Sequence, residues 1–224
     1  MAGSRDDAPR VHAETLEEWR DWLRTHHETE TGAWLVSWKS ATGRPRVRYE
    51  EAVEEALCVG WIDSAGRTLD DERHMLWFTR RKPGSGWART NKERLVRLEA
   101  EDRMLPAGRT VVDAAKSDGS WTLLDDVENL LVPDDLAAAF DRHPGSRAQF
   151  DAFPPSARRA ILEWIVHARR ETTRAARVEE SARLAAQGER ANQWKPKGSQ
   201  PQVRGRFGGP PPARVPCAGP GDVA

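Results

Sequence analysis

Two tryptophan-rich segments with a period of two constrain the fold of this chain more than any other feature. Residues 33–39 place three large side chains on one side of an extended backbone: Trp34, Val36 and Trp38. Residues 73–80 alternate in the same way, with two sets of side chains on opposite sides: His74, Leu76 and Phe78 against Met75, Trp77 and Thr79. Because this period is typical of strands, we expect both segments to belong to one sheet.

Helical signals surround these strands. Thr15, with Glu18 three residues later, forms a capping box and predicts a helix that begins there. A second helix is expected over residues 50–58, ended by Gly60 in a left-handed conformation, and a short strand over residues 61–63. The remainder of the chain reads as about five helices. The sequence therefore predicts an α+β fold, with a small antiparallel sheet and N-terminal helices followed by a helical C-terminal half.

Tryptophan supplies most of the aromatic core. The 224 residues include ten Trp but five Phe and one Tyr, and each buried indole removes a large apolar area from water. The 35 Lys and Arg residues balance 35 Asp and Glu residues, so a general attraction to nucleic acid or to a membrane surface is not expected. Acidic residues concentrate in 49–63 and 125–141, which we interpret as solvated helix faces and internal ion pairs.

Composition divides the chain into four parts. We expect a disordered N-terminus over residues 1–14, an α+β domain with a basic loop over 15–120, and a C-terminal helical region over 121–190. Residues 191–224 are rich in Pro and Gly and predict a disordered tail. Its Arg-Gly segment, 204–209, is reminiscent of RNA-binding segments, although a plain tail is the simpler interpretation.

Cysteine usage and the terminal sequence indicate the cellular compartment. Cys58 and Cys217 have no spacing that suggests a disulfide framework or a zinc site. The N-terminus lacks the apolar segment of a signal peptide, and no apolar run is long enough to cross a membrane. We therefore expect a cytoplasmic protein with no metal, no cofactor and no membrane partner.

A basic loop broken by glycines follows the second predicted strand. Residues 78–87 read FTRRKPGSGW, and residues 73–97 contain eight Lys or Arg but one acidic residue, Glu93. Thr90, three residues before Glu93, predicts a helix start directly after the loop. Adjacent cations, glycine-freed amides and a helix N-terminus together favour an anion site. The alternative is a solvated turn whose cations pair with an acidic helix face formed by Glu51, Glu54 and Glu55.

Two segments, taken together, resemble a known family. Residues 55–64 read EALCVGWIDS, and residues 78–87 are followed by Asn91. This combination resembles the YdeI/OmpD-associated family, also called bacteriocin-protection proteins. Residues 154–159 (PPSARR) and 188–190 (GER) also look like the C-terminal helical part of that family.

The chain departs from the family pattern at several positions. Val59 stands where we expect Phe, Arg80 stands for Pro, Gly86 for Asn and Ala88 for Ser. Arg80 makes the loop more basic, and Ala88 removes a hydroxyl on which a mechanism could have rested. The resemblance implies an association with bacteriocin or stress resistance and with an outer-membrane porin, and it implies no established catalytic activity.

Three residues are candidates for catalysis. Cys58 lies at the C-terminal end of its predicted helix, where the helix dipole raises a thiol pKa, so core packing is favoured over a nucleophile. Asp63 is expected to form an ion pair with Arg80 or Arg81. His74 is the nearby imidazole that could turn Asp63 into an acid–base pair, although a histidine at the edge of the core is the simpler interpretation.

We therefore predict a ligand site at the basic loop and no catalytic site. Its residues are expected to be Trp61, Asp63, Arg80, Arg81, Lys82, Ser85, Trp87 and Asn91. The expected ligand is a small anion that bears a phosphate or a carboxylate, bound by a noncatalytic protein. Two alternatives stay open: a nucleic-acid-binding module that uses the basic stretch and the Arg-Gly tail, and an enzyme that uses Cys58 or Asp63.

Overall fold

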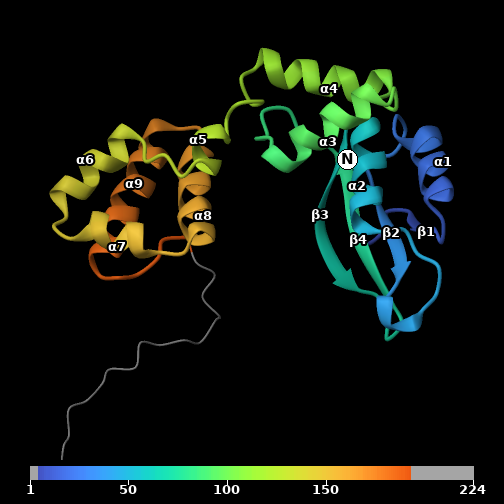
Figure 1. Cartoon of the computed structure of the whole chain (residues 1–224), viewed down its shortest axis with the longest axis horizontal. Helices are drawn as coiled ribbons and strands as arrows, with labels where there is room; N and C mark the ends of the chain where they lie inside the picture. The colour runs from blue at the N-terminus through green and yellow to red at the C-terminus, as the bar shows by residue number, and fades with distance from the viewer. Residues whose placement is uncertain (1–4, 193–224) are drawn as a thin grey trace, which may run out of the picture. The chain divides into compact units, whose positions relative to one another are not determined.

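The computed structural model describes residues 5–192, and Figure 1 shows the order of their helices and strands. The strands are β1 (Arg10–His12), β2 (Gly32–Trp38), β3 (Trp61–Thr68) and β4 (Arg73–Arg80). The helices are α1 (Leu16–His26), α2 (Tyr49–Cys58), α3 (Arg89–Ala100), α4 (Pro106–Ser117), α5 (Asp125–Glu128), α6 (Asp134–Arg142), α7 (Ser146–Ala152), α8 (Pro155–Val166) and α9 (Glu171–Ala186), with a 3-10 turn at Ser40–Thr42. The predictions for the tail from residue 193 onward, which include the Arg-Gly segment and Cys217, lie outside the described residues.

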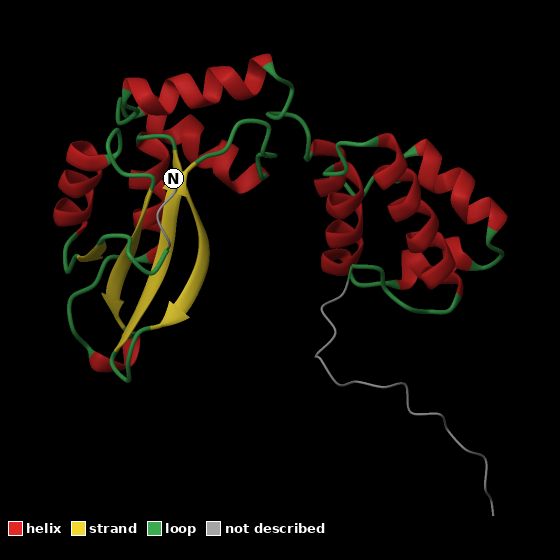
Figure 2. Ribbon diagram, turned by 180° about the vertical axis from the view of Figure 1, so that it is seen from behind, coloured by secondary structure: helices red, strands yellow, loops and turns green. Residues whose placement is uncertain are grey.

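The four strands form one sheet in the order β1-β2-β4-β3, which confirms the α+β fold class (Figure 2). β4 runs antiparallel to both β2 and β3, as expected, but β1 runs parallel to β2, so the sheet is mixed and not purely antiparallel. The expectation of a disordered N-terminus is also wrong for β1. The three residues of β1 are too few to show a period, and the strand is held by pairing with β2, including a bond from the Trp34 N–H to the Pro9 carbonyl (2.8 Å).

The alternation of β2 and β4 buries both faces of the sheet. Ala33 and Leu35 face α1 and α2 and join the main hydrophobic core, which also contains Phe78 of β4. Figure 1 shows α2 lying along this face of the sheet. The opposite face carries a smaller cluster of buried residues, Trp34, Val36, Met75 and Trp77. Arginines cover it, with the Arg67 guanidinium 4.3 Å from the Trp34 ring, so cation–π contacts replace a second layer of helices.

β3 is longer than the sequence indicated. The strand was expected over 61–63, but it continues to Thr68 after an irregularity in its pairing with β4 between Asp63 and Gly66. The second half of β3 is largely exposed and polar, so it has no apolar alternation by which it could be recognised. Pairing with β4 therefore defines this part of the strand.

Some of the helix ends predicted from local signals are correct, and one is wrong. The Thr15–Glu18 capping box is present, and Gly60 ends α2 with a φ of 77°, as expected. The helix start at Thr90 is wrong, because α3 begins at Arg89 and its N-cap is Ala88, whose side chain cannot accept a hydrogen bond. The N-terminus of α3 is satisfied by a more distant residue, described below.

The helices α5–α9 enclose a second hydrophobic core, built from residues between Leu124 and Ala191. The strongly amphipathic stretch of α8 contributes Ile161, Leu162 and Ile165. Two of these helices, α5 and α7, were not predicted, because four and seven residues are too short to show a helical period. The acidic run 125–141 forms internal ion pairs, for example between Asp135 and Arg174 (2.6 Å).

None of the helices in residues 5–192 combines the length and the apolar composition that crossing a membrane requires.

Candidate functional site

The basic loop joins β4 to α3, and its first cation is a structural residue. Arg80 lies opposite Trp61 in the sheet, and its guanidinium reaches the C-terminal end of α1. Its Nε donates a hydrogen bond to the His27 carbonyl (3.0 Å), and a terminal nitrogen donates to the Glu28 carbonyl. The indole of Trp61 donates to the same His27 carbonyl (3.4 Å). Arg80 and Trp61 therefore hold the end of α1.

Arg81 differs from its exposed neighbours Arg80 and Lys82 because its side chain is half-buried. The guanidinium carbon is 3.7 Å from the centroid of the Trp87 ring, and one terminal nitrogen donates to the Gly86 carbonyl. The Nε of Arg81 is buried and has no hydrogen-bond partner within the described residues. Burial lowers the pKa of Arg81 to about 10, because the charged form is poorly solvated there.

Trp87 anchors the loop to the core. The ring is 2% exposed, and it packs against Trp121 with the ring centroids 5.3 Å apart. One face of Trp87 therefore carries the Arg81 cation, which is a favourable geometry for a cation–π contact. The indole is a core residue that positions Arg81.

A small cavity of about 60 Å³ lies beside Arg81. The loop contributes Arg81, Lys82, Pro83, Gly84, Ser85 and Trp87 to its walls. α4 and the turn after it contribute Val111, Ala114, Ala115, Asp118 and Ser120. Four of the eight predicted site residues therefore line one cavity: Arg81, Lys82, Ser85 and Trp87.

Carboxylates of the protein already occupy several donors that the sequence assigned to a ligand. The Gly84 N–H donates to an Asp118 oxygen (3.1 Å), and the Arg89 N–H at the start of α3 donates to both oxygens of Glu128 (3.0 Å each). The Ser85 hydroxyl donates to the Lys82 carbonyl (2.6 Å). The helix N-terminus is thus closed by Glu128, and the site is reduced to the side chains around Arg81.

Asp63 and Asn91 make contacts of their own outside this cavity. Asp63 lies opposite Phe78 in the sheet and accepts a hydrogen bond from the Tyr49 hydroxyl (3.0 Å). Burial and the neighbouring Asp63 charge raise the pKa of Tyr49. Asp63 forms no ion pair with a described arginine, so the expected pairing with Arg80 or Arg81 is wrong. Asn91 accepts a bond from Arg94 (2.8 Å).

The acidic face of α2 does not pair with the basic loop. Glu55 is buried and accepts hydrogen bonds from Arg20 (2.8 and 2.9 Å) and Arg103 (2.7 Å). Glu54 pairs with Arg97 (2.8 Å) and with Arg103 (3.3 Å). The interpretation of the loop as a turn neutralised by this face is therefore wrong, and the cation of Arg81 has no carboxylate partner among the described residues.

The groups proposed for catalysis are not assembled. Cys58 is 4% exposed, and burial, reinforced by the Glu55 charge, raises the pKa of its thiol to about 12. His74 lies opposite Thr68 in the sheet, four residues along β4 from the position opposite Asp63. The hypothesis that Asp63 and His74 form an acid–base pair is therefore wrong. Burial next to cationic Arg46 and Lys39 lowers the pKa of His74.

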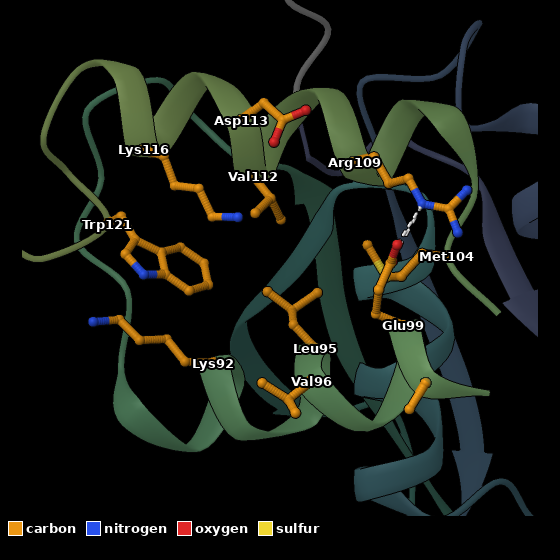
Figure 3. A pocket seen from close by; sticks show the side chains of 11 residues that line it. Lys92, Leu95, Val96, Glu99, Met104, Arg109, Val112, Asp113, Lys116 and Trp121 are labelled. Atoms are coloured by element: carbon orange, nitrogen blue, oxygen red, sulfur yellow. Dashed lines mark hydrogen bonds and ion pairs between the residues drawn. The ribbon is translucent and has the colours of Figure 1, made fainter. Parts of the chain in front are cut away.

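A second, larger hollow of about 590 Å³ lies between α3 and α4, and the sequence did not indicate it (Figure 3). α3 contributes Lys92, Leu95, Val96, Glu99 and Ala100, and the following segment contributes Met104, Arg109, Val112, Asp113, Lys116 and Trp121. The helical period of both segments was visible in the sequence. Which faces remain uncovered depends on how the two helices pack.

Two family models match different parts of the chain. Residues 11–111 match the model described as a domain of unknown function (DUF8412), and this range contains both motifs that suggested a resemblance. Residues 129–188 match the model described as bacteriocin-protection, YdeI or OmpD-associated. No curated protein and no solved structure matches the chain significantly. The resemblance to the bacteriocin-protection, YdeI or OmpD-associated family is therefore confirmed by the helical region of the chain, residues 129–188.

Proposed function

We propose that this chain is a noncatalytic protein of the bacteriocin-protection type that binds a small anion in the cavity beside Arg81. The family match supports the general association with bacteriocin protection. The anion site is inferred from one observation: the half-buried Arg81 cation has no carboxylate partner among the described residues, and its buried Nε donates no hydrogen bond to any of them. A partly desolvated cation without a carboxylate partner is costly for the folded protein, and an anion at this position would offset that cost.

The size of the cavity limits the ligand. At about 60 Å³ the cavity is far smaller than typical small-molecule sites, which occupy roughly 300–1,000 Å³. A chloride or small oxyanion, or the terminal carboxylate or phosphate of a larger molecule, is therefore the expected occupant. Lys82 is exposed at the rim and has no carboxylate partner within the described residues, so its ammonium group is free to contact the exposed part of such a ligand.

The expected affinity is modest. Each charge-assisted hydrogen bond contributes about 1.5–3 kcal/mol, and two or three of them must also offset the cost of association. Dissociation constants in the micromolar to millimolar range follow from these magnitudes. Such a site suits an abundant cellular anion better than a scarce regulatory one.

The two alternatives have less support. Most cations of the basic stretch are already engaged: Lys92 with Asp125, Arg97 with Glu54, and Arg80 with backbone carbonyls. They therefore offer few free charges for phosphates of a nucleic acid. An enzyme that uses Cys58 would need a thiolate, and the raised pKa of this thiol opposes its formation.

Thermal unfolding with added anions tests the proposal. Phosphate, sulfate, chloride and acetate are compared at constant ionic strength in wild type and in Arg81→Met, which keeps much of the apolar stem and removes the charge. Arg44→Met is the matched control, because Arg44 also stacks on an indole, 4.2 Å from the Trp38 ring, but far from the loop in sequence. A ligand at 100 times its dissociation constant stabilises a protein by about 2.7 kcal/mol.

We expect at least one anion to raise the unfolding temperature of wild type and of Arg44→Met, but not that of Arg81→Met. If no anion stabilises the wild type, the protein does not bind a small anion here. If Arg81→Met responds as wild type does, the anion binds at another place and the assignment to this cavity is wrong.

A further inference from the structure

The hollow between α3 and α4 has the size and lining of a small-molecule site that is separate from the Arg81 cavity. Its volume of about 590 Å³ falls within the range of ligand pockets, roughly 300–1,000 Å³. Figure 3 shows side chains of both helices, among them Leu95, Val112 and Lys116, directed into the space between them. We call this space the α3–α4 groove.

The floor of the groove is apolar. Leu95 and Met104 form its buried base, and Val112 is half-buried beside them. Val96 lies at the edge and is 71% exposed, which is the largest exposure of any large apolar side chain noted among the described residues. An uncovered valine beside an apolar floor gives a ligand with an apolar group a surface to pack against.

One end of the groove is formed by Trp121 and two lysines. The ammonium nitrogens of Lys92 and Lys116 lie 5.2 and 5.5 Å from the centroid of the Trp121 ring. Lys92 forms an ion pair with Asp125, so its charge is largely neutralised. Lys116 forms no ion pair within the described residues, and in Figure 3 its side chain extends from α4 into the groove.

The groove also carries one unpaired carboxylate. Asp113 lies three residues before Lys116 on α4, so the two side chains are neighbours on one helix face. Neither forms an ion pair with the other or with a further described residue. At the far end, Glu99 and Arg109 neutralise each other (2.9 Å). The charges available to a ligand are therefore one carboxylate and one ammonium, one helical turn apart, above an apolar floor.

We propose that the α3–α4 groove binds a small zwitterion with an apolar side chain, of the chemical class of an apolar α-amino acid. Such a molecule carries its ammonium and its carboxylate on one carbon. The ammonium meets Asp113, the carboxylate meets Lys116, and the side chain packs on Leu95, Val96 and Val112. A simple anion would face Asp113 and a simple cation would face Lys116, so either meets repulsion as well as attraction.

The test uses leucine as the probe, with two derivatives that each remove one charge. N-acetylleucine lacks the ammonium group, and leucinamide lacks the carboxylate. Binding to the full chain is followed by NMR at the methyl groups of Val96, Val112 and Met104 and at the Trp121 indole. Because exposed ion pairs contribute modestly, we expect each derivative to bind about two- to fivefold more weakly than leucine, which itself binds in the millimolar range.

Two variants separate the two contacts. In Asp113→Asn the preference for leucine over N-acetylleucine should disappear, and in Lys116→Met the preference over leucinamide should disappear. Both positions are exposed on α4, so neither change is expected to prevent folding. Val96→Glu tests the apolar part of the groove and should weaken the binding of leucine itself. Arg81→Met is the matched control and should bind leucine as wild type does, which keeps this proposal distinct from the anion site.

Three results would overturn the inference. Leucine could leave the groove signals unchanged at concentrations of tens of millimolar. Leucine and both derivatives could bind equally, which would make the groove a nonspecific apolar surface. Finally, sedimentation could show that the chain self-associates through the groove, with Val96→Glu abolishing the association and leucine having no effect.

Discussion

The guanidinium of Arg81 stacks on Trp87, with its carbon 3.7 Å from the ring centroid. This contact holds a half-buried cation of the basic loop beside a small cavity, where it has no carboxylate partner among residues 5–192. Trp87 packs in turn on Trp121, which lines the larger α3–α4 groove. These two indoles, tilted at 47° to each other, therefore connect the walls of the two hollows, so substitutions at either ring test the structural basis of both.

Replacement of Trp87 should destabilise the protein strongly. Trp87→Ala removes a ring that is 2% exposed and leaves a cavity beside Arg81. We expect the free energy of unfolding to fall by about 3–5 kcal/mol, as for other large-to-small substitutions in a core. Urea denaturation measures this change. Trp121→Ala is the control, because its ring is half-buried, and it should lower the free energy of unfolding clearly less. Equal losses of stability in the two variants would contradict the assignment of Trp87 to the core.

Glu55 should stabilise the fold through its two arginines. Burial acts to raise the pKa of Glu55, but hydrogen bonds from Arg20 and Arg103 prevail and hold it below its usual value. Glu55→Gln leaves these arginines without their shared buried carboxylate, and we expect a loss of about 3 kcal/mol at pH 7. Glu51→Gln, at a partly exposed pair with Arg48, should cost less than about 1 kcal/mol.

The contribution of Glu55 should also depend on pH. Because its pKa is lowered in the folded state, the stabilisation is complete above the unfolded pKa, about 4.3, and is lost as the pH falls through the folded pKa. Urea denaturation of wild type and Glu55→Gln between pH 7 and pH 3 should therefore give two stability curves that converge at acidic pH. A difference that stays constant down to pH 3 would show that folding does not lower the pKa of Glu55.

Cys58 should resist alkylation while the protein is folded. With its thiol pKa raised to about 12, the thiolate fraction at pH 8 is on the order of one in ten thousand, and the sulfur is buried. The measurement is the rate of reaction with iodoacetamide in a Cys217→Ser background. We expect rapid reaction in denaturant and very slow reaction without it. Rapid alkylation of the native protein would revive the enzyme hypothesis.

Gly108 should be essential for packing α4 against α2. A methyl group at this position would lie 2.4 Å from the Cys58 carbonyl oxygen, which already accepts a bond from the Leu105 N–H (3.0 Å). Gly108→Ala should therefore cost about 1–3 kcal/mol through overpacking, despite the better helix propensity of alanine. Gly66→Ala is the matched control, because its nearest neighbours lie at 3.9 Å. Equal stability of the two variants would contradict the close approach of these helices.

The local sequence was sufficient for much of the fold. The period of two in β2 and β4, the capping box at Thr15 and the positive φ of Gly60 depend on residues close together in the chain. β1, α5 and α7 could not be predicted in this way, because each is short and is stabilised by contacts with distant segments. The match of residues 129–188 likewise supports the family that the motifs suggested.

The candidate site was predicted less well, for a physical reason. The sequence alone identified the cations, the glycines and the indole of the basic loop, because their types and order are local. It could not show that Asp118 and Glu128 satisfy the loop amide and the helix N-terminus, since these carboxylates lie 34 and 39 residues from the groups they bind. Only the tertiary structure decided which charges remained without partners, because pairing depends on which distant segments pack together.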